Sequence, residues 1–323
     1  MTAIYFNRVS QLSLLIFLMM TTNTPHTKAQ DKFSELVYPF EMHIMQSIEG
    51  IEVAYADEGS ANEETILFVH GLGSYAPSWK YTVQELSKTY RCIVVDLAGY
   101  GKSSKGKYPA SMAFHSKHLF QLMEKLGIES YHLVGHSMGG QIGLTMALDR
   151  PDQIKSLVLI APAGIETFTE EEAAFLKKVS TPELIASVSD EQYRANLNMN
   201  FYSMDERAEF MYNDRMLIKT DPLFKDYCFV VSEGIKGMLN GPVYDQLSNI
   251  QCPSLIIFGK QDQLIPNRYL HKDLTTEFIA NRAKEAIPHA EMHMIDKAGH
   301  FAHFDQPEKI NTLINKFLRT NNH

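Results

Sequence analysis

A single serine, Ser137, lies among glycines in residues 133–143, which read LVGHSMGGQIG. An apolar run precedes the serine and an apolar run with helical spacing follows it. Gly135 and Gly139 lie two residues to either side of it, so the five residues fit G-x-S-x-G, a pattern that requires a turn from a strand into a helix. Side chains at those two positions would clash in so tight a turn. We therefore predict that Ser137 is a nucleophile held at a helix N-terminus, where free N–H groups stabilise developing negative charge.

A serine hydroxyl is a poor nucleophile until a base accepts its proton. His300 is the best placed of the thirteen histidines, because it follows the last predicted strand in the turn KAGHFAHF. Loops at the carboxyl ends of strands are where α/β proteins build their sites. His303 lies three residues later and is a near rival. His70 and His136 lie within glycine motifs, where structural hydrogen bonds are the better expectation.

The base needs a carboxylate that holds its tautomer and stabilises the imidazolium. Asp262 is the first carboxylate at the end of the preceding predicted strand, in FGKQDQLIP. Asp96 also ends a predicted strand, but that strand comes before the serine, so we expect Asp96 to brace the neighbouring turn. The order Ser137, Asp262, His300 is an order in which such triads occur along a chain.

Attack on a carbonyl also needs N–H donors for the oxyanion. The expected donors are the backbone N–H of Met138, directly after the nucleophile, and the backbone N–H of Leu72 in HGLGS. The flanking glycines of HGLGS let that backbone approach the site. Two side chains just beyond it are candidates for lining the substrate pocket: Ser74 and Trp79.

The elements that position these residues alternate between strands and helices. A β-hairpin is predicted over residues 42–59, around Glu49-Gly50. The other predicted strands are apolar on both faces, as in a sheet covered on both sides, and they span residues 65–73, 90–103, 129–137, 154–164, 252–262 and 290–300. Helical spacing occurs between them, for example over residues 111–126 and 138–148. The pattern predicts a mainly parallel α/β sheet.

Residues 165–245 interrupt this alternation. The segment has helical spacing, no convincing buried strand and more acidic than basic residues, yet it is rich in aromatics and methionines. We expect a helical lid over one end of the sheet, with most of its apolar side chains in its own core and a minority facing the sheet. The core would then consist of residues 30–164 and 246–323.

Six segments resemble the α/β-hydrolase fold superfamily, in its lidded serine-hydrolase branch that includes esterases and carbon–carbon bond hydrolases. These are FVHGLGSYAPSW, VVDLAGYGKSS, LVGHSMGG, LVLIAPAG, FGKQDQLIP and AGHFAHFDQPEKI. The resemblance implies an eight-stranded, mainly parallel sheet with helices on both faces, and Ser137, Asp262 and His300 as nucleophile, acid and base. Related haloalkane dehalogenases and epoxide hydrolases use an aspartate as nucleophile, so Ser137 argues against both. Residues 271–288 make one connection longer than expected and are long enough to add a helix.

The expected activity is hydrolysis of a carboxylic ester of a small to medium apolar acyl group through an acyl-enzyme, with no metal or organic cofactor. One alternative is a carbon–carbon bond hydrolase of aromatic breakdown. Such an enzyme would need a basic residue in the substrate pocket, and the sequence shows no obvious candidate for that residue. The others are a cofactor-free perhydrolase and a non-catalytic ligand-binding relative.

Charge and the N-terminus bear on partners and location. The formal net charge of −8 argues against a nucleic-acid partner, which leaves a small-molecule ester as the expected partner and the oligomeric state open. Residues 1–29 have the layout of a signal peptide: Arg8, an apolar stretch over residues 12–20, and small residues Thr27 and Ala29 before the expected cut. The stretch is shorter than the roughly 20 residues of a membrane span. We expect export to the periplasm or medium; a leader retained as an anchor is the alternative.

Overall fold

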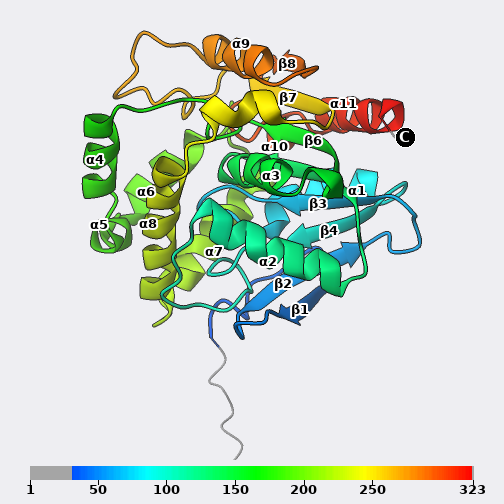
Figure 1. Ribbon diagram of the computed structural model, residues 1–323. Coiled ribbons are helices and arrows are strands. Elements are labelled where there is room, and N and C mark those ends of the chain that lie inside the picture. The colour runs from blue at the N-terminus through cyan, green and yellow to red at the C-terminus, as the bar shows by residue number, and fades with distance from the viewer. Residues whose placement is uncertain (1–30, 322–323) are drawn as a thin grey trace, which may run out of the picture. The chain divides into compact units, whose positions relative to one another are not determined.

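The computed structural model describes residues 31–321, so the predicted signal peptide lies outside the described residues. The described part is built on one eight-stranded sheet with the order β1-β2-β4-β3-β5-β6-β7-β8 (Figure 1). Its strands are β1 (Met42–Gln46), β2 (Glu52–Glu58), β3 (Thr65–Val69), β4 (Arg91–Val95), β5 (Tyr131–His136), β6 (Ile154–Ile160), β7 (Ser254–Gly259) and β8 (Glu291–Ile295).

The sheet is parallel from β4 to β8 and antiparallel at one edge. β1 pairs with β2, and β2 with β4, in antiparallel register, whereas the remaining pairs are parallel. Every residue of β3, β5 and β7 is buried, which explains their continuous apolar runs. The predicted eight-stranded, mainly parallel sheet and the predicted hairpin are both confirmed.

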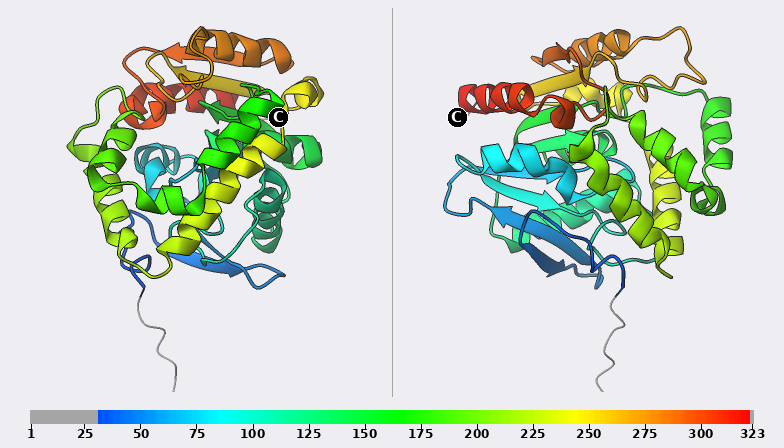
Figure 2. Two further views of the ribbon diagram at one scale, coloured as in Figure 1. Left: turned by 90° about the vertical axis from the view of Figure 1, so that its left-hand side faces the viewer. Right: turned by 180° about the vertical axis from the view of Figure 1, so that it is seen from behind.

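Helices cover both faces of the sheet (Figures 1 and 2). Buried side chains of α2, α3 and α9 share one apolar core with the sheet, and those of α1 and α11 share the core on the opposite face. α9 falls within the long connection 271–288 and packs on β7 and β8. In the described part of the chain, the α-helices outside residues 165–245 are α1 (Lys80–Leu86), α2 (Met112–Lys125), α3 (Met138–Asp149), α9 (Thr276–Ala286), α10 (Ala302–Asp305) and α11 (Pro307–Thr320).

Five α-helices lie between β6 and β7 and group together beside the sheet (Figures 1 and 2). Hydroxyl side chains cap the first three: Thr169, Thr181 and Ser189 each accept a hydrogen bond from a backbone N–H of the first turn. We call these helices the insertion: α4 (Glu170–Val179), α5 (Pro182–Ser187), α6 (Asp190–Asn198), α7 (Glu209–Lys219) and α8 (Phe224–Asn240).

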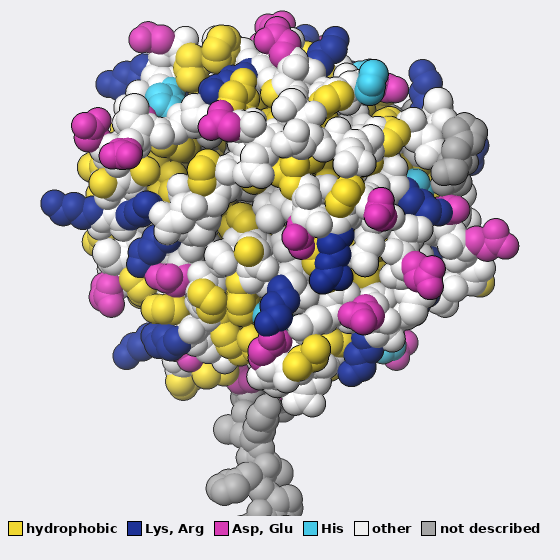
Figure 3. All heavy atoms as spheres, in the orientation of Figure 1, with side chains coloured by type: hydrophobic (Ala, Val, Ile, Leu, Met, Phe, Trp, Pro, Cys, Tyr) yellow, Lys and Arg dark blue, Asp and Glu magenta, His cyan; other side chains and the backbone are white. Residues whose placement is uncertain are grey.

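The surface carries charges of both signs, interspersed with apolar side chains over the face shown in Figure 3. Within residues 31–321, no helix combines the length and the apolar character needed to cross a membrane.

Candidate active site

Ser137 lies at the junction of β5 and α3 with φ 54° and ψ −117°, a backbone conformation that is strained for a residue with a side chain. The flanking glycines make the turn feasible. A Cβ on Gly135 would collide with the carbonyl of Gly139, and one on Gly139 would collide with the carbonyl of Val69. The Ser137 N–H donates to the Ile160 carbonyl at 3.0 Å, which fastens the turn to β6. The sequence pattern therefore has the local structure that it predicted.

His300 and Asp262 meet at the ends of neighbouring strands. His300 Nδ1–H donates to Asp262 Oδ2 at 2.8 Å, and both side chains are buried. The other carboxylate oxygen, Oδ1, accepts the backbone N–H groups of Leu264 at 2.8 Å and Ile265 at 3.1 Å. Asp262 is thereby held in place, and it orients the imidazole so that Nε2 is left to exchange a proton.

Ser137 and His300 line the same cavity, of about 470 Å³, which we call the larger cavity. No hydrogen bond joins Ser137 Oγ to His300 Nε2 among the described residues. In unliganded enzymes this contact is often long and tightens when substrate binds. A minority of the insertion's apolar side chains was expected to face the sheet, and five of them form part of the cavity wall: Ala173, Leu176, Ile235, Met238 and Leu239.

His303 and Trp79 belong to the core instead. Their rings stack with centroids 4.3 Å apart, both side chains are buried, and neither lines the larger cavity. Burial lowers the pKa of His303 to about 3, and the proximity of His300 adds to this effect. The expectation that Trp79 lines the pocket is wrong, because packing between β3 and α1 turns its indole into the apolar core.

The two expected oxyanion donors flank the nucleophile. A Cβ on Gly71 would lie 3.0 Å from the Ser137 Cβ, so the HGLGS segment passes directly beside the serine. Leu72 lines the larger cavity, and Met138 is the first residue of α3. Neither Leu72 N–H nor Met138 N–H donates a hydrogen bond to another described residue. Both N–H groups are therefore uncommitted within the described residues, as oxyanion donors need to be.

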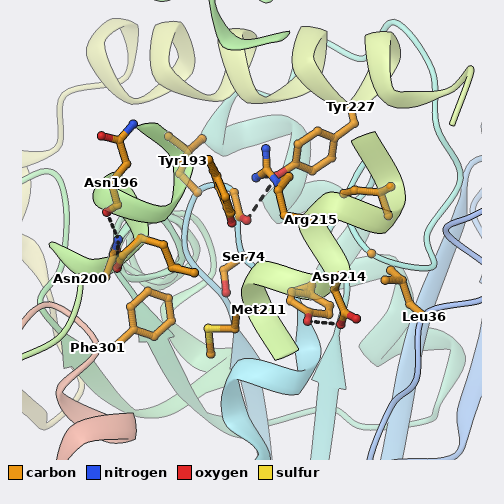
Figure 4. Close-up of a pocket in the computed structure, with 16 residues that line it drawn as sticks. Leu36, Ser74, Tyr193, Asn196, Asn200, Met211, Asp214, Arg215, Tyr227 and Phe301 are labelled. Carbon is orange, nitrogen blue, oxygen red and sulfur yellow. Dashed lines mark hydrogen bonds between the residues drawn. The ribbon is translucent and has the colours of Figure 1, made fainter. Parts of the chain in front are cut away.

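A second cavity, of about 160 Å³, adjoins the larger one (Figure 4). Leu72, Asn200 and Phe301 line both cavities. Ser74, expected in the substrate pocket, lines this smaller cavity and is absent from the wall of the larger one.

Arg215, on α7, is the cation that lines the smaller cavity (Figure 4). Its guanidinium lies near the rings of Tyr193 and Tyr227 and donates a hydrogen bond to the Tyr227 hydroxyl. That hydroxyl in turn donates to the carbonyl of Gly73 at 3.2 Å. Within residues 31–321, no carboxylate pairs with Arg215. The sequence analysis missed this residue, because nothing in the helical spacing of α7 indicates which side chain faces a cavity.

Glu166 is a second charged residue that the sequence analysis missed. It lines the larger cavity, and its Oε1 accepts hydrogen bonds from Asn267 N–H, at 2.8 Å, and from His271 Nδ1–H. Burial raises the pKa of the Glu166 carboxyl. His271 comes from the long connection after β7, so this contact joins residues that are 105 positions apart.

Asp96 and His70 have structural roles, as expected. Asp96 accepts hydrogen bonds from the backbone N–H groups of Ala76 and Lys102, both at 2.7 Å, and so braces two turns. His70 Nδ1–H donates to the Gly71 carbonyl, while Nε2 accepts the Leu97 N–H at 3.0 Å.

The model of a protein family described as alpha/beta hydrolase fold matches residues 64–307. This match covers most of the chain and includes every candidate site residue from Leu72 to His300. The chain belongs to the alpha/beta hydrolase fold family. The sheet order and the nucleophile turn of this alpha/beta hydrolase agree with that membership.

Three comparisons show the range of its relatives. The chain is 26% identical to a dihydrolipoyllysine-residue acetyltransferase component of an acetoin cleaving system from Cupriavidus necator, over 91% of this chain and 72% of that protein. It is 28% identical to a 2-hydroxy-6-oxononadienedioate/2-hydroxy-6-oxononatrienedioate hydrolase from Paraburkholderia phymatum, over 93% and 99%. A solved structure of a probable hydrolytic enzyme from Pseudomonas aeruginosa PAO1 superposes with a TM-score of 0.77 at 23% identity, covering 88% of this chain and 96% of that one. At that identity the superposition shows a shared fold.

Proposed function

We propose that this alpha/beta hydrolase is a serine hydrolase that cleaves carboxylic esters of small to medium apolar acyl groups through an acyl-enzyme. One observation carries the proposal: a serine in a strained strand-to-helix turn shares a mostly apolar cavity with a histidine that is hydrogen-bonded to a buried aspartate. The aspartate fixes the imidazole, the turn exposes the hydroxyl, and the cavity suits an apolar acyl or alkyl chain.

The reaction would proceed in two halves. As Ser137 Oγ bonds to the ester carbonyl carbon, its proton moves to His300 Nε2, and the oxyanion accepts the N–H groups of Leu72 and Met138. The carbon–oxygen bond to the alcohol then breaks, and the proton on His300 passes to the departing oxygen. A water molecule attacks the resulting acyl-enzyme by the same route, which releases the acid and restores the serine. Asp262 stabilises the imidazolium in both halves.

The insertion is proposed as the lid of this site. α4 and α8 supply apolar walls of the larger cavity, and α6 and α7 supply Asn196, Met211 and Arg215 to the smaller one. By covering the two reacting side chains, the insertion would reduce their contact with bulk water, and a less polar surrounding strengthens the electrostatic stabilisation of the oxyanion.

A series of p-nitrophenyl esters of increasing acyl length tests the activity. We expect turnover by the wild-type protein that peaks at a short or medium acyl chain, and a loss of about 10³-fold or more in kcat for Ser137→Ala. A fluorophosphonate should label the wild-type chain and leave Ser137→Ala unlabelled. Equal turnover by the two proteins would reject the assignment.

A carbon–carbon bond hydrolase is the second candidate, and Arg215 is the observation that favours it. A guanidinium with no carboxylate partner, beside the proposed oxyanion segment, is suited to bind a substrate carboxylate. The relative from Paraburkholderia phymatum is named for a dienedioate, a substrate class that carries carboxylates. Assay of a vinylogous diketone from aromatic ring cleavage decides between the two: hydrolysis of simple esters without hydrolysis of the ring-cleavage product would reject this candidate.

A further inference from the structure

The larger cavity contains one carboxylate that the proposed mechanism does not use, that of Glu166. The Glu166 side chain is 8% exposed, although it lies in the wall of the cavity that also holds Ser137 and His300. Its Oε1 already accepts two hydrogen bonds, from Asn267 and His271. Its Oε2 accepts none from the described residues, and it retains some accessible surface, since it is not among the fully occluded unpaired atoms. A largely buried side chain in the cavity wall therefore retains an acceptor oxygen that no described residue occupies.

The charges around Glu166 leave this corner of the cavity negative. His271 lies between two carboxylates, with Nδ1 donating to Glu166 and Nε2 3.3 Å from Glu172. No lysine or arginine forms an ion pair with Glu166 in the described part of the chain. Burial, and to a smaller extent the proximity of Asp262, raises the pKa of Glu166, whereas its hydrogen bonds with His271 and Asn267 oppose this rise. A positive or hydrogen-donating ligand group would relieve this imbalance, whereas an added carboxylate would increase it.

We propose that Glu166 is a specificity determinant of the larger cavity. It accepts a hydrogen bond from a donor group, hydroxyl or ammonium, on the part of the substrate that occupies this cavity, and it disfavours a carboxylate there. The inference rests on the proposed function, because it takes the substrate to be a carbonyl compound that Ser137 attacks. To that function it adds a polar group at the end of the substrate's apolar chain.

The charged side chains that line the two cavities differ. The smaller cavity holds the guanidinium of Arg215 together with Asp214, whose carboxylate accepts a hydrogen bond from the Tyr75 hydroxyl, whereas the larger cavity holds the carboxylate of Glu166. A compound with a carboxylate at each end would satisfy Arg215 but would place its second carboxylate beside Glu166. This chain should therefore differ in specificity from a hydrolase named for a dienedioate.

Esters that are matched in length and differ only in their terminal group provide the test. The acyl series comprises p-nitrophenyl esters of hexanoate, 6-hydroxyhexanoate, 6-aminohexanoate and adipate. A second series varies the same termini on the alcohol of a butyrate ester, because either part of the substrate could occupy the larger cavity. The values of kcat/KM are compared among wild type, Glu166→Gln and Glu172→Gln. Glu172 contacts the same histidine from outside the cavity, and glutamine can replace it in its capping box, so Glu172→Gln is a matched control.

The quantity to follow is kcat/KM for the donor-bearing ester divided by kcat/KM for the carboxylate-bearing ester. In at least one of the two series, we expect Glu166→Gln to lower this ratio by about 5-fold or more, because a hydrogen bond to a charged group is lost. The hydroxyl and ammonium esters, each compared with the unsubstituted ester, identify which donor is recognised. The ratio should change less than about 2-fold in Glu172→Gln. An unchanged ratio in Glu166→Gln in both series, or an equal change in the control, overturns the proposal.

Ligand binding separates this proposal from the proposed activity. Calorimetric affinities for hexylamine, hexanol and hexanoate require no turnover, so they test Glu166 even if no ester is hydrolysed. Glu166→Gln should weaken hexylamine or hexanol relative to hexanoate by about 5-fold or more. Glu166→Met, which is similar in length, replaces the glutamine variant if that variant does not fold. Relative affinities unchanged from wild type would overturn the role of Glu166, whereas the Ser137→Ala comparison alone decides the activity.

Discussion

The backbone N–H of Phe301 donates a hydrogen bond to the carbonyl oxygen of Asn200 at 2.8 Å. Phe301 follows the proposed base, and Asn200 lies in the connection between α6 and α7 of the insertion, so this bond joins two parts of the chain that line both cavities. A single oxygen of Asp305 reinforces the junction, because it accepts both the Gly299 N–H, at 2.7 Å, and the Tyr202 N–H, at 2.8 Å. The position of His300 is therefore coupled to the packing of the insertion.

Gly299→Ala should loosen this junction. A Cβ at position 299 would lie 2.6 Å from the carbonyl carbon of Phe201, so the backbone of the insertion must shift. We expect a fall of about 1–3 kcal/mol in the free energy of unfolding, measured by urea denaturation, and a fall in kcat because His300 moves with its loop.

Gly50→Ala is the comparison for that variant. Gly50 has φ 78° in the β1–β2 turn and no atom within 4 Å of an added Cβ, so alanine there carries only the left-handed backbone penalty of about 1–2 kcal/mol. It should lose stability and retain activity. If Gly299→Ala also retained full activity, the coupling between the insertion and the base would be refuted.

Asp262→Asn should preserve the fold and remove most of the activity. Asparagine has the same shape, but it cannot stabilise an imidazolium, and its amide can favour the other imidazole tautomer. We expect kcat for p-nitrophenyl esters to fall about 10³–10⁴-fold. Asp296→Asn, at an exposed aspartate that follows β8 and pairs with Lys260, serves as the control and should change kcat little. Comparable losses in the two variants would contradict the assigned role.

Arg215→Met should reduce the preference for anionic substrates. The aliphatic part of the side chain is kept, whereas the only guanidinium that lines the smaller cavity in the described residues is lost. We expect kcat/KM for a carboxylate-bearing substrate to fall about 10-fold or more relative to that for a neutral ester. Arg150→Met removes a cation that lies over the Phe120 ring and lines neither cavity, so the same ratio should be preserved. A ratio unaffected by Arg215→Met would argue against carboxylate binding there.

His115 should make the fold sensitive to acid. Burial lowers the pKa of this α2 histidine to about 3, with smaller effects from His70 and His118. The unfolded chain, with a pKa near 6.5, binds the proton first, so stability is complete above about pH 6.5 and declines as the pH falls towards 3. Between pH 6.5 and 4.5 the decline from this group is about 2–3 kcal/mol. His115→Leu should flatten the pH dependence of the unfolding free energy by that amount; an unchanged slope would show that His115 is not the source.

Local patterns were sufficient for the nucleophile turn and for the sheet. The glycines around Ser137 indicate a tight turn because only glycine tolerates the backbone contacts of that turn, and apolar strands alternating with helical spacing indicate a covered parallel sheet. The membership of the alpha/beta hydrolase fold family follows from the same segments. These features depend on neighbours along the chain, which a sequence displays directly.

The lining of the cavities depended on the tertiary structure. Trp79 follows the HGLGS segment in the sequence but packs in the core. Arg215 and Glu166 have no local sequence pattern that marks them as cavity residues. Arg215 lines the smaller cavity because of the way in which α7 packs, and Glu166 contacts His271, which lies 105 positions away in the chain. A helical repeat shows which side chains share a face, but which face meets a cavity is set by packing against distant elements. The sequence by itself thus determined the fold and the candidate chemistry of this protein, and only its tertiary structure decided which charges a substrate would meet.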